Sequence, residues 1–369
     1  MMTNSAQNSQ KSIFLVRHGL SDFNAQGRMQ GSSDESLLSD AGKHTASEVG
    51  RYLKCIGIHS AVSSSLVRVR QTAEIVLSRV EHKPVLEFDY ELRETDLYQW
   101  EGQKLSAISR ERPDEFHAFK YDPANFSLLH NGQSVFPIRE LYHRAGKFWQ
   151  KNVTRFVKGN NLVVSHGGTI QALINTALGL GPGAHHAFQP SNCGISCLEV
   201  GETEEGHAGC FVLKQLNNTV PLGEKLPKLK AGKEGVRVLY YPVEGLLSGE
   251  DMVALSELCM IDVIFRHTSV TVDTDFIAAG LRSREFDLKS DEIDSAVRRF
   301  TGKGKPFKTY LVVAPADDIR MRLKTISDVS EAFVSRMILQ LRTLTVVHHV
   351  YSHPVPILQC VNIPVSHES

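Results

Sequence analysis

The sequence lacks an excess of either charge and any long hydrophobic run. Its 41 Lys and Arg residues balance 41 Asp and Glu residues, whereas proteins that bind nucleic acids or membrane surfaces carry a basic excess. No apolar run approaches the roughly 20 residues that cross a bilayer. The first eleven residues have no apolar core and do not resemble a secretory signal. We therefore expect neither a nucleic-acid partner nor a membrane partner.

Cysteine is also scarce, with six residues spread over a chain of 369 and no Cys-X-X-Cys motif. Such isolated cysteines are typical of buried, reduced thiols, so we expect a cytoplasmic location, or the chloroplast stroma in a plastid-bearing organism. The pairs His185–His186 and His348–His349 have no evident third ligand, and side chains adjacent on one element do not converge on a metal. The sequence thus predicts no metal and no cofactor, and it gives no indication of the oligomeric state.

Buried strands and amphipathic helices are expected to alternate along the first 220 residues. The apolar run at 13–16 is typical of a strand buried on both faces, and segments 60–63 and 162–165 are further expected strands. Ser39 is a suitable N-cap for a helix whose apolar residues follow at spacings of three and four, and Gly57 is a suitable end. This alternation predicts an α/β fold with a mostly parallel sheet, in which ligands bind beyond the carboxyl ends of the strands.

Four segments carry groups suited to a phosphate ester. They are Arg17-His18-Gly19, Arg68, Glu94 and His166-Gly167-Gly168. A phosphate monoester carries about two negative charges at neutral pH, so its hydrolysis needs cationic donors, an in-line nucleophile and an acid for the leaving oxygen. Arginine forks and the backbone N–H groups of glycines suit phosphate oxygens. A neutral imidazole is a nucleophile that needs no metal, and it forms a phosphohistidine.

Each segment also has an ordinary structural explanation. Arg-His-Gly by itself is most often a surface turn, and His166, after a buried strand, fits a hydrogen-bonded core residue. Arg68 fits the solvated face of a helix, and Glu94 fits a loop. Only the combination of the four segments therefore favours phosphate chemistry.

In combination, the segments resemble the histidine phosphatase superfamily, also called phosphoglycerate-mutase-like. The matching stretches, in the order and at the spacing of the family, are IFLVRHGLSDFN, SSSLVRVRQTAE, LRETDLYQWEG and LVVSHGG. The resemblance implies a three-layer α/β sandwich with a mostly parallel central sheet. It implies that His18 is the nucleophile and Glu94 the proton donor. It further implies that Arg17, Arg68 and His166 bind the phosphoryl group.

Five more residues are candidates for binding the substrate. The resemblance implies that Asn24 contacts the phosphate, and Ser21 and Gly167 are further candidates for that pocket. Arg28 and Arg70 are candidates to meet a carboxylate of the substrate. The partner that we expect is accordingly a small phosphorylated metabolite.

A finer resemblance concerns the substrate. The segments RMQGSSDESLLSDAG, YDPANF and FPIRELYHRAGKFW look like the plant and cyanobacterial branch that contains 2-carboxy-D-arabinitol-1-phosphate phosphatase. This implies hydrolysis of a sugar-acid phosphate such as 2-carboxy-D-arabinitol 1-phosphate. A phosphoserine phosphatase, a phosphoglycerate mutase and a non-enzymatic regulatory protein that binds a phosphorylated metabolite stay open as alternatives. One departure from the wider superfamily is Tyr98, which stands where the family has glycine.

The second half of the chain resembles a weaker repeat of the first. LVVAPADDI at 311–319 matches LVVSHGGTI at 162–170, and VRVLYYPVE at 236–244 weakly matches SIFLVRHGL at 12–20. In this register, Pro242 stands where His18 stands, and Pro315 stands where His166 stands. The predicted organisation is a catalytic domain at 12–220, a linker at 221–235 that is rich in Pro, Gly and Lys, and a smaller degenerate α/β domain of related topology at 236–366. That second domain is expected to be non-catalytic, with strands at 236–241, 261–265 and 310–314 and a helix at 291–300.

Overall fold

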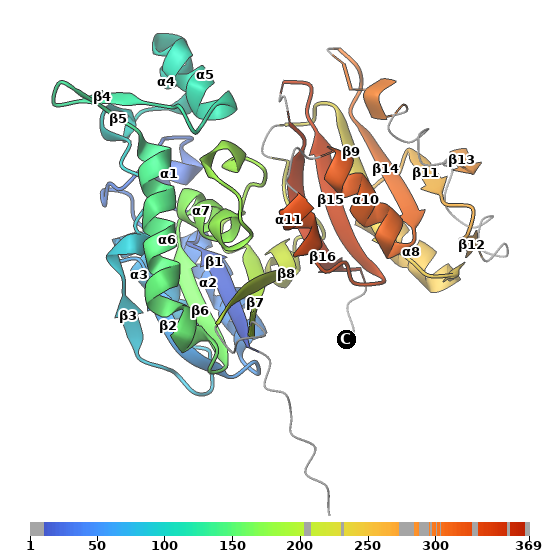
Figure 1. Ribbon diagram of the computed structural model, residues 1–369, viewed down its shortest axis with the longest axis horizontal. Coiled ribbons are helices and arrows are strands. Elements are labelled where there is room, and N and C mark those ends of the chain that lie inside the picture. The colour runs from blue at the N-terminus through green and yellow to red at the C-terminus, as the bar shows by residue number, and fades with distance from the viewer. Residues whose placement is uncertain are drawn as a thin grey trace, which may run out of the picture.

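One sheet of twelve strands runs through both halves of the molecule (Figure 1). The computed structural model describes residues 11–202, 208–229, 232–272, 284–287, 295, 297–299, 301–302, 304–326, 331–352 and 355–365. The strands of the first half are β1 (Ser12–Arg17), β2 (Ile58–Ser63), β3 (Leu86–Phe88), β6 (Asn160–Ser165), β7 (Ile195–Glu202) and β8 (Ala208–Asn218). Those of the second half are β9 (Val236–Pro242), β11 (Val263–Arg266), β13 (Arg284–Asp287), β14 (Lys308–Ala314), β15 (Thr343–His349) and β16 (Ile357–Pro364). Two short ribbons lie outside this sheet: β4 (Leu128–His130) with β5 (Gln133–Val135), and β10 (Leu246–Leu247) with β12 (Thr271–Val272).

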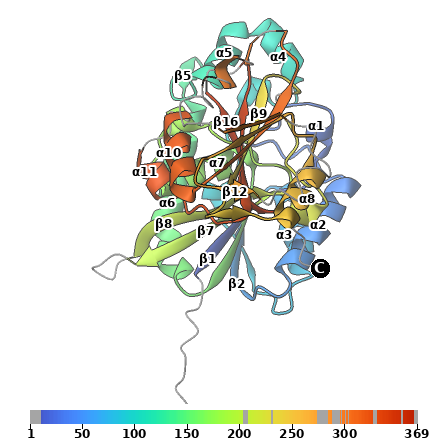
Figure 2. The ribbon, with the colours of Figure 1, turned by 90° about the vertical axis from the view of Figure 1, so that its right-hand side faces the viewer.

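Helices cover both faces of the sheet in the first half, which gives three layers (Figures 1 and 2). Alternate residues of β1 explain this, because Ile13 and Leu15 pack into one core and Phe14 and Val16 into the other. The helices of the first half are α1 (Asp22–Ala25), α2 (Asp40–Leu53), α3 (Val67–Leu77), α4 (Leu105–Glu111), α5 (Pro113–Tyr121), α6 (Pro137–Phe156) and α7 (Gly167–Ala177). Those of the second half include α8 (Gly249–Leu258), α10 (Ala316–Ile326) and α11 (Glu331–Ser335). None of the helices in the described ranges is long and apolar enough to cross a membrane.

The sheet is mixed, so the prediction of a mostly parallel sheet is corrected. Its strand order is β13-β11-β14-β9-β15-β16-β8-β7-β1-β6-β2-β3. Neighbouring strands are parallel in six pairs and antiparallel in five. The antiparallel pairs lie in the middle of the sheet, because β7 and β8, and likewise β15 and β16, follow each other without a crossover helix. A pattern of alternating strands and helices indicates parallel units, and it does not show that strands which follow each other without a helix pair in antiparallel directions.

Several local predictions are confirmed by the structure. The expected strand at 12–17 is β1, and the side chain of Ser39 accepts a hydrogen bond from Gly42 N at the start of α2. Gly57, just after that helix, has φ +71°, a conformation that suits glycine. The expected strands near 60 and 162 are β2 and β6. These elements place the ends of β1, β6 and β2 next to one another.

The two halves have the same strand order and directions. From one edge of the sheet inward, the first half runs β3-β2-β6-β1-β7-β8 and the second half runs β13-β11-β14-β9-β15-β16. The two meet where β8 and β16 run antiparallel at Leu216 and Val361. Asn217 and Asn362 flank this point, both with positive φ, and each donates its Nδ2 to a backbone oxygen of the other strand, Gln359 O at 2.8 Å and Lys214 O at 2.6 Å. An approximate two-fold relation therefore links the halves.

The structure shifts the register of the sequence repeat by one residue in β9. Arg17 is paired with Ser165, and Pro242 is paired with Ala314. Likewise, His18 N donates to Ser165 O and Val243 N donates to Ala314 O. Val243 therefore lies where His18 lies, and Pro242 lies where Arg17 lies. Every residue of β9 is buried, so the strand lacks the alternation of buried and exposed residues that would fix the alignment. The sequence repeat is therefore aligned one residue out of register.

Pro315 does occupy the place of His166. Its carbonyl accepts a hydrogen bond from Ile319 N at the start of α10, as His166 O does from Ile170 N at the start of α7. Most of the expected helix at 291–300 lies outside the described residues. The expected linker is partly packed, since Leu222 contacts the core beneath α2 and α3, and Leu226 contacts the core of the second half.

Candidate active site

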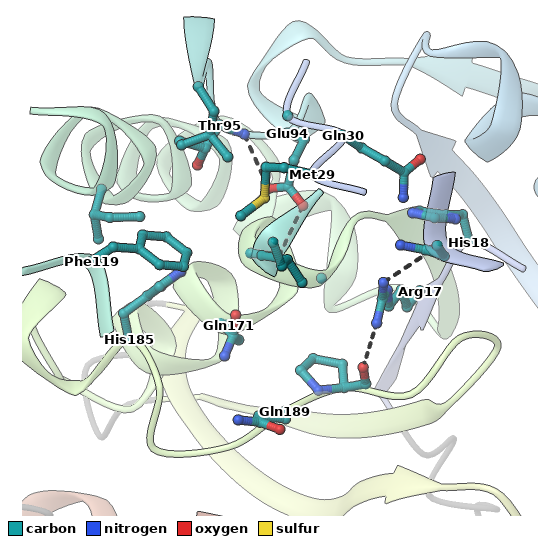
Figure 3. A pocket seen from close by; sticks show the side chains of 18 of the residues that line it. Arg17, His18, Met29, Gln30, Glu94, Thr95, Phe119, Gln171, His185 and Gln189 are labelled. Carbon is teal, nitrogen blue, oxygen red and sulfur yellow. Dashed lines mark hydrogen bonds between the residues drawn. The ribbon is translucent and has the colours of Figure 1, made fainter. Parts of the chain in front are cut away.

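The predicted chemical groups meet at the carboxyl ends of three adjacent parallel strands. His18 follows β1, His166 follows β6, and Arg68 lies one turn beyond the end of β2. His18 and Arg68 line a cavity of about 340 Å³, together with Arg17 and Glu94, while the buried ring of His166 lies behind its wall (Figure 3). The structure thus brings these side chains together beyond the ends of the three strands, where ligands bind in such sheets.

His18 is held as a neutral imidazole with one nitrogen left for reaction. Its ring is buried, and Nδ1 lies 2.7 Å from the carbonyl of Gly19. Because a carbonyl only accepts, Nδ1 carries the proton and the lone pair is on Nε2. Burial, followed by the charges of Arg17 and Arg68, holds the pKa of His18 well below its usual range. The side chain is therefore uncharged at neutral pH and can act as a nucleophile.

Two buried guanidinium groups flank this imidazole. Arg17 donates to Pro190 O at 2.9 Å and to Asn24 Oδ1 at 3.2 Å, and Arg68 donates to Ser33 O and Gly31 O. Burial lowers the pKa of Arg68 to about 10, which leaves it charged at neutral pH. The Nε atoms of both arginines are buried and have no hydrogen-bond partner among the residues that the structure describes. Buried N–H donors of this kind indicate a binding site for an anion, because leaving a buried polar group without a hydrogen bond costs free energy.

His166 lies opposite His18, with ring centroids 5.4 Å apart. Its Nδ1 accepts from Arg68 at 3.2 Å, since a guanidinium only donates. The proton is therefore on Nε2, which lies 2.9 Å from the hydroxyl of Ser64. Burial, followed by the charge of Arg68, holds the pKa of His166 well below its usual range. His166 is thus neutral and bonded on both ring nitrogens, and its Nε2 proton can reach an anion only in exchange for the hydroxyl of Ser64.

Glu94 is fixed at the N-terminus of α7 by backbone donors. Its Oε2 accepts from Gly168 N at 3.1 Å and its Oε1 from Thr95 N at 3.0 Å. A Cβ atom on Gly168 would lie 2.7 Å from Oε1 of Glu94, so only glycine permits this approach. The carboxyl group consequently has a defined position at the wall of the cavity.

The candidate binding residues divide into two groups. Asn24, Gly167 and Arg28 line the cavity. Ser21 and Arg70 are absent from its lining. Ser21 is the N-cap of α1 and donates its hydroxyl to Gln30 Oε1, and Arg70 is half exposed on α3 and lies 3.9 Å from Glu74. Ser21 and Arg70 are therefore not placed to touch a substrate in this cavity, because Ser21 caps a helix and Arg70 points to solvent.

Several residues of the site were missed in the sequence. Ser64 bonds His166, and Asn192 donates to His18 O, Gly19 O and Asn24 Oδ1. Helices α4 and α5 supply Leu105 and Phe119 to the cavity wall, and the segment after α7 supplies other lining residues, namely His185, His186, Gln189 and Pro190. Motif spacing contains no signal for these contacts, since they arise from segments far apart in the chain.

Tyr98 has φ +46°, which explains the glycine that the family resemblance placed there. Its ring stacks on His130 of the β4–β5 ribbon with centroids 4.0 Å apart. The stacking offsets part of the cost of the left-handed backbone. In this chain the position therefore anchors the ribbon.

Comparison with known proteins places this geometry in a family. The chain matches the histidine phosphatase superfamily (branch 1) over residues 13–218. A probable 2-carboxy-D-arabinitol-1-phosphatase from Arabidopsis thaliana is 32% identical over 67% of this chain and 50% of that protein. A 2-carboxy-D-arabinitol-1-phosphatase from Triticum aestivum is 35% identical over 57% of this chain and 41% of that protein. A probable phosphoglycerate mutase from Erwinia tasmaniensis is 32% identical over 51% of this chain and 84% of that protein.

The chain spans half or less of the length of the two plant relatives that it matches. The match to the superfamily runs from β1 to β8 and includes His18, Arg68, Glu94 and His166. The chain therefore belongs to branch 1 of the histidine phosphatase superfamily.

Proposed function

We propose that the chain is a phosphomonoesterase that works through a phosphohistidine on His18 and needs no metal. The observation that carries this proposal is the state of His18, a buried neutral imidazole whose Nδ1 is occupied by Gly19 O and which lies between Arg17 and Arg68. A lone pair on Nε2 among cationic donors suits in-line attack on a phosphate dianion.

The proposed reaction has two steps. Nε2 of His18 forms a bond to phosphorus while the ester P–O bond breaks and Glu94 gives its proton to the leaving oxygen. Water then attacks the phosphohistidine, the N–P bond breaks, and Glu94 takes a proton from that water. Arg17, Arg68 and His166 hold the phosphoryl oxygens in both steps. No step requires a metal, because the counter-charges are guanidinium groups.

The proposed substrate is a sugar-acid phosphate such as 2-carboxy-D-arabinitol 1-phosphate. Support comes from the activity for which the two plant relatives are named. It also comes from Arg28, a cation in the cavity wall that is suited to bind a carboxylate. Asn24 and the N–H of Gly167 are proposed as phosphate contacts. The bacterial relative supports a second candidate, phosphoglycerate mutase, which would return the phosphoryl group to substrate instead of to water.

We propose that residues 236–366 form a degenerate, non-catalytic copy of the first domain. Val243, Pro242 and Pro315 occupy the places of His18, Arg17 and His166, and proline supplies no backbone N–H to an anion. Glu244 Oε1 accepts from Ala316 N at 3.3 Å, so a carboxylate already lies at the N-terminus of α10. This arrangement disfavours phosphate in the second cleft.

A panel of phosphorylated metabolites tests the function. We expect the protein to release inorganic phosphate from sugar-acid phosphates at an unchanged rate in EDTA, because arginines supply the counter-charge. Phosphate release and acid-labile, base-stable labelling of the protein are the measurements. Loss of activity in EDTA with recovery on adding magnesium or zinc would contradict the metal-independent mechanism. Conversion of 3-phosphoglycerate to 2-phosphoglycerate without phosphate release would instead identify a mutase.

Replacing Gly168 with alanine is expected to lower kcat strongly while the fold persists. The new Cβ would meet Glu94 Oε1 at 2.7 Å and push the carboxyl group from its position. We expect a loss of about 100-fold, as is typical when a general acid is misplaced. Gly146→Ala on α6 is the matched control, since a Cβ there has no neighbour within 4 Å. Equal kcat values for the two variants would show that Glu94 does not need its present position.

A further inference from the structure

Besides the Nε atoms of Arg17 and Arg68, two buried polar atoms of the cavity wall have no hydrogen-bond partner within the described part of the chain. They are Oγ1 of Thr95 and Nδ1 of His185, on side chains that are 4% and 2% exposed. Figure 3 shows Thr95 beside Glu94, and His185 with Phe119 on the side of the cavity away from Arg17 and His18. An unpaired buried polar atom is costly, so its presence in a cavity wall points to a ligand group that pairs with it.

Thr95 lies where the carbon chain of a substrate leaves the reaction centre. It directly follows Glu94, and its backbone N donates to Glu94 Oε1 at 3.0 Å. The leaving oxygen must lie beside the Glu94 carboxyl group, so the carbon atoms bonded to it pass the Thr95 side chain. His185, at the far end, is then positioned to meet more distant groups of the same chain.

His185 is a fixed, uncharged partner. Burial, followed by the neighbouring His186, holds its pKa well below the usual range, so the ring has one donor and one acceptor nitrogen. The ring contacts Tyr142 edge-on at 5.8 Å and His186 at 4.9 Å. The segment that carries it is tied to β16 of the second half, where Leu358 N donates to Ala187 O at 2.9 Å. The position of this ring therefore does not depend on a bound ligand.

The charges of the cavity decide which ligand group fits. Of its charged lining residues among those described, Arg17, Arg68 and Glu94 belong to the phosphate end. Arg28, which donates to Gly102 O, is the remaining one and is assigned above to a carboxylate. His185 has the neutral neighbours Tyr142 and His186, and Thr95 adjoins the carboxyl group of Glu94, so a second anion at either place would lose its hydration without gaining a counter-charge. A hydroxyl group both donates and accepts, as do a threonine hydroxyl and a neutral imidazole.

We propose that Thr95 and His185 form a subsite for the hydroxyl groups on the carbon chain of the substrate. The subsite selects polyhydroxylated phosphate esters over short or apolar ones of equal charge. It deepens the proposed phosphomonoesterase function, on which it rests, by naming the feature of the substrate that the far end of the cavity recognises.

The test compares three esters in the full-length protein: 6-phosphogluconate, which has a carboxylate and several hydroxyls, 2-phosphoglycolate, which has only the carboxylate, and p-nitrophenyl phosphate. Binding is measured both as KM and as competitive inhibition of p-nitrophenyl phosphate turnover, which also covers esters that are not hydrolysed. Wild-type protein should bind 6-phosphogluconate more tightly than 2-phosphoglycolate. Thr95→Val and His185→Leu should each weaken the binding of 6-phosphogluconate about three- to tenfold, the effect of one neutral hydrogen bond, and weaken the binding of the other two esters by a smaller factor.

His185→Asn is the matched rescue, because its amide can replace the Nδ1 position and should recover part of the lost affinity. Equal effects of Thr95→Val on all three esters, or a wild-type protein without preference for the hydroxylated ester, would overturn the subsite. Failure of the proposed function is a different result, in which wild-type protein neither hydrolyses p-nitrophenyl phosphate nor forms phosphohistidine.

Discussion

Replacing His18 with alanine is expected to abolish turnover, lowering kcat by about 10⁴-fold or more, as removal of a covalent nucleophile does. The methyl group of alanine cannot form the N–P bond. His166 cannot replace His18 as the nucleophile, because both of its ring nitrogens are hydrogen-bonded. His185 cannot replace it either, because it lies at the far end of the cavity. The measurements are the release of phosphate from p-nitrophenyl phosphate and labelling of the protein with radioactive phosphate.

The matched control for this variant is His349→Ala. His349 is a partly buried histidine whose pKa burial lowers to about 4, and it lies on β15 of the second half. It should keep both turnover and labelling. Because His18→Ala leaves residues 236–366 intact, any activity that survives would also contradict the proposal that the second half is non-catalytic.

Replacing Glu94 with glutamine is expected to separate two classes of substrate. Alkyl phosphates need a proton on the leaving oxygen, so their kcat should fall about 10²- to 10⁴-fold when the acid is lost. p-Nitrophenolate leaves with little protonation, and its loss should be much smaller. The amide keeps the size of the side chain and can still accept from Gly168 N, so the cavity should hold its shape. Steady-state kinetics on 6-phosphogluconate and p-nitrophenyl phosphate give the comparison.

Glu91→Gln provides the control for the loss of a negative charge nearby. Glu91 lies three residues earlier in the chain and outside the cavity lining, so neither substrate should be affected. If Glu94→Gln slowed both substrates equally, Glu94 would act by holding the loop and α7 together rather than by transferring a proton.

The sequence predicted the chemical end of the site well, for a physical reason. His18, Arg68 and His166 each follow a short buried strand, and the carboxyl ends of adjacent parallel strands meet at one edge of a sheet. Once the strands are recognised, the convergence of these side chains follows without further information. Arg70 shows the limit of this reasoning. It lies two residues from Arg68 on α3, yet its side chain points to solvent, because the packing of the helix decides which of its faces is buried.

The far end of the site could not be predicted in this way. His185 follows α7 in a segment held by β16, and Phe119 comes from α5, so this part of the cavity wall combines two segments with no common spacing. Sequence patterns report the environment along one element. They contain no information on which distant segment closes a cavity.

What the sequence by itself determined is the set of local elements and the candidate residues for the chemistry. Alternating apolar patterns, the cap at Ser39 and the glycine at position 57 each act within one turn or strand, where propensity and short-range hydrogen bonds decide the structure. What only the tertiary structure decided is the mixed sheet, the junction of β8 with β16, the one-residue register of β9 and the neutral subsite of Thr95 and His185. These features depend on pairing and packing between separate segments of the chain, where the free energy comes from burial of surfaces that no local pattern identifies.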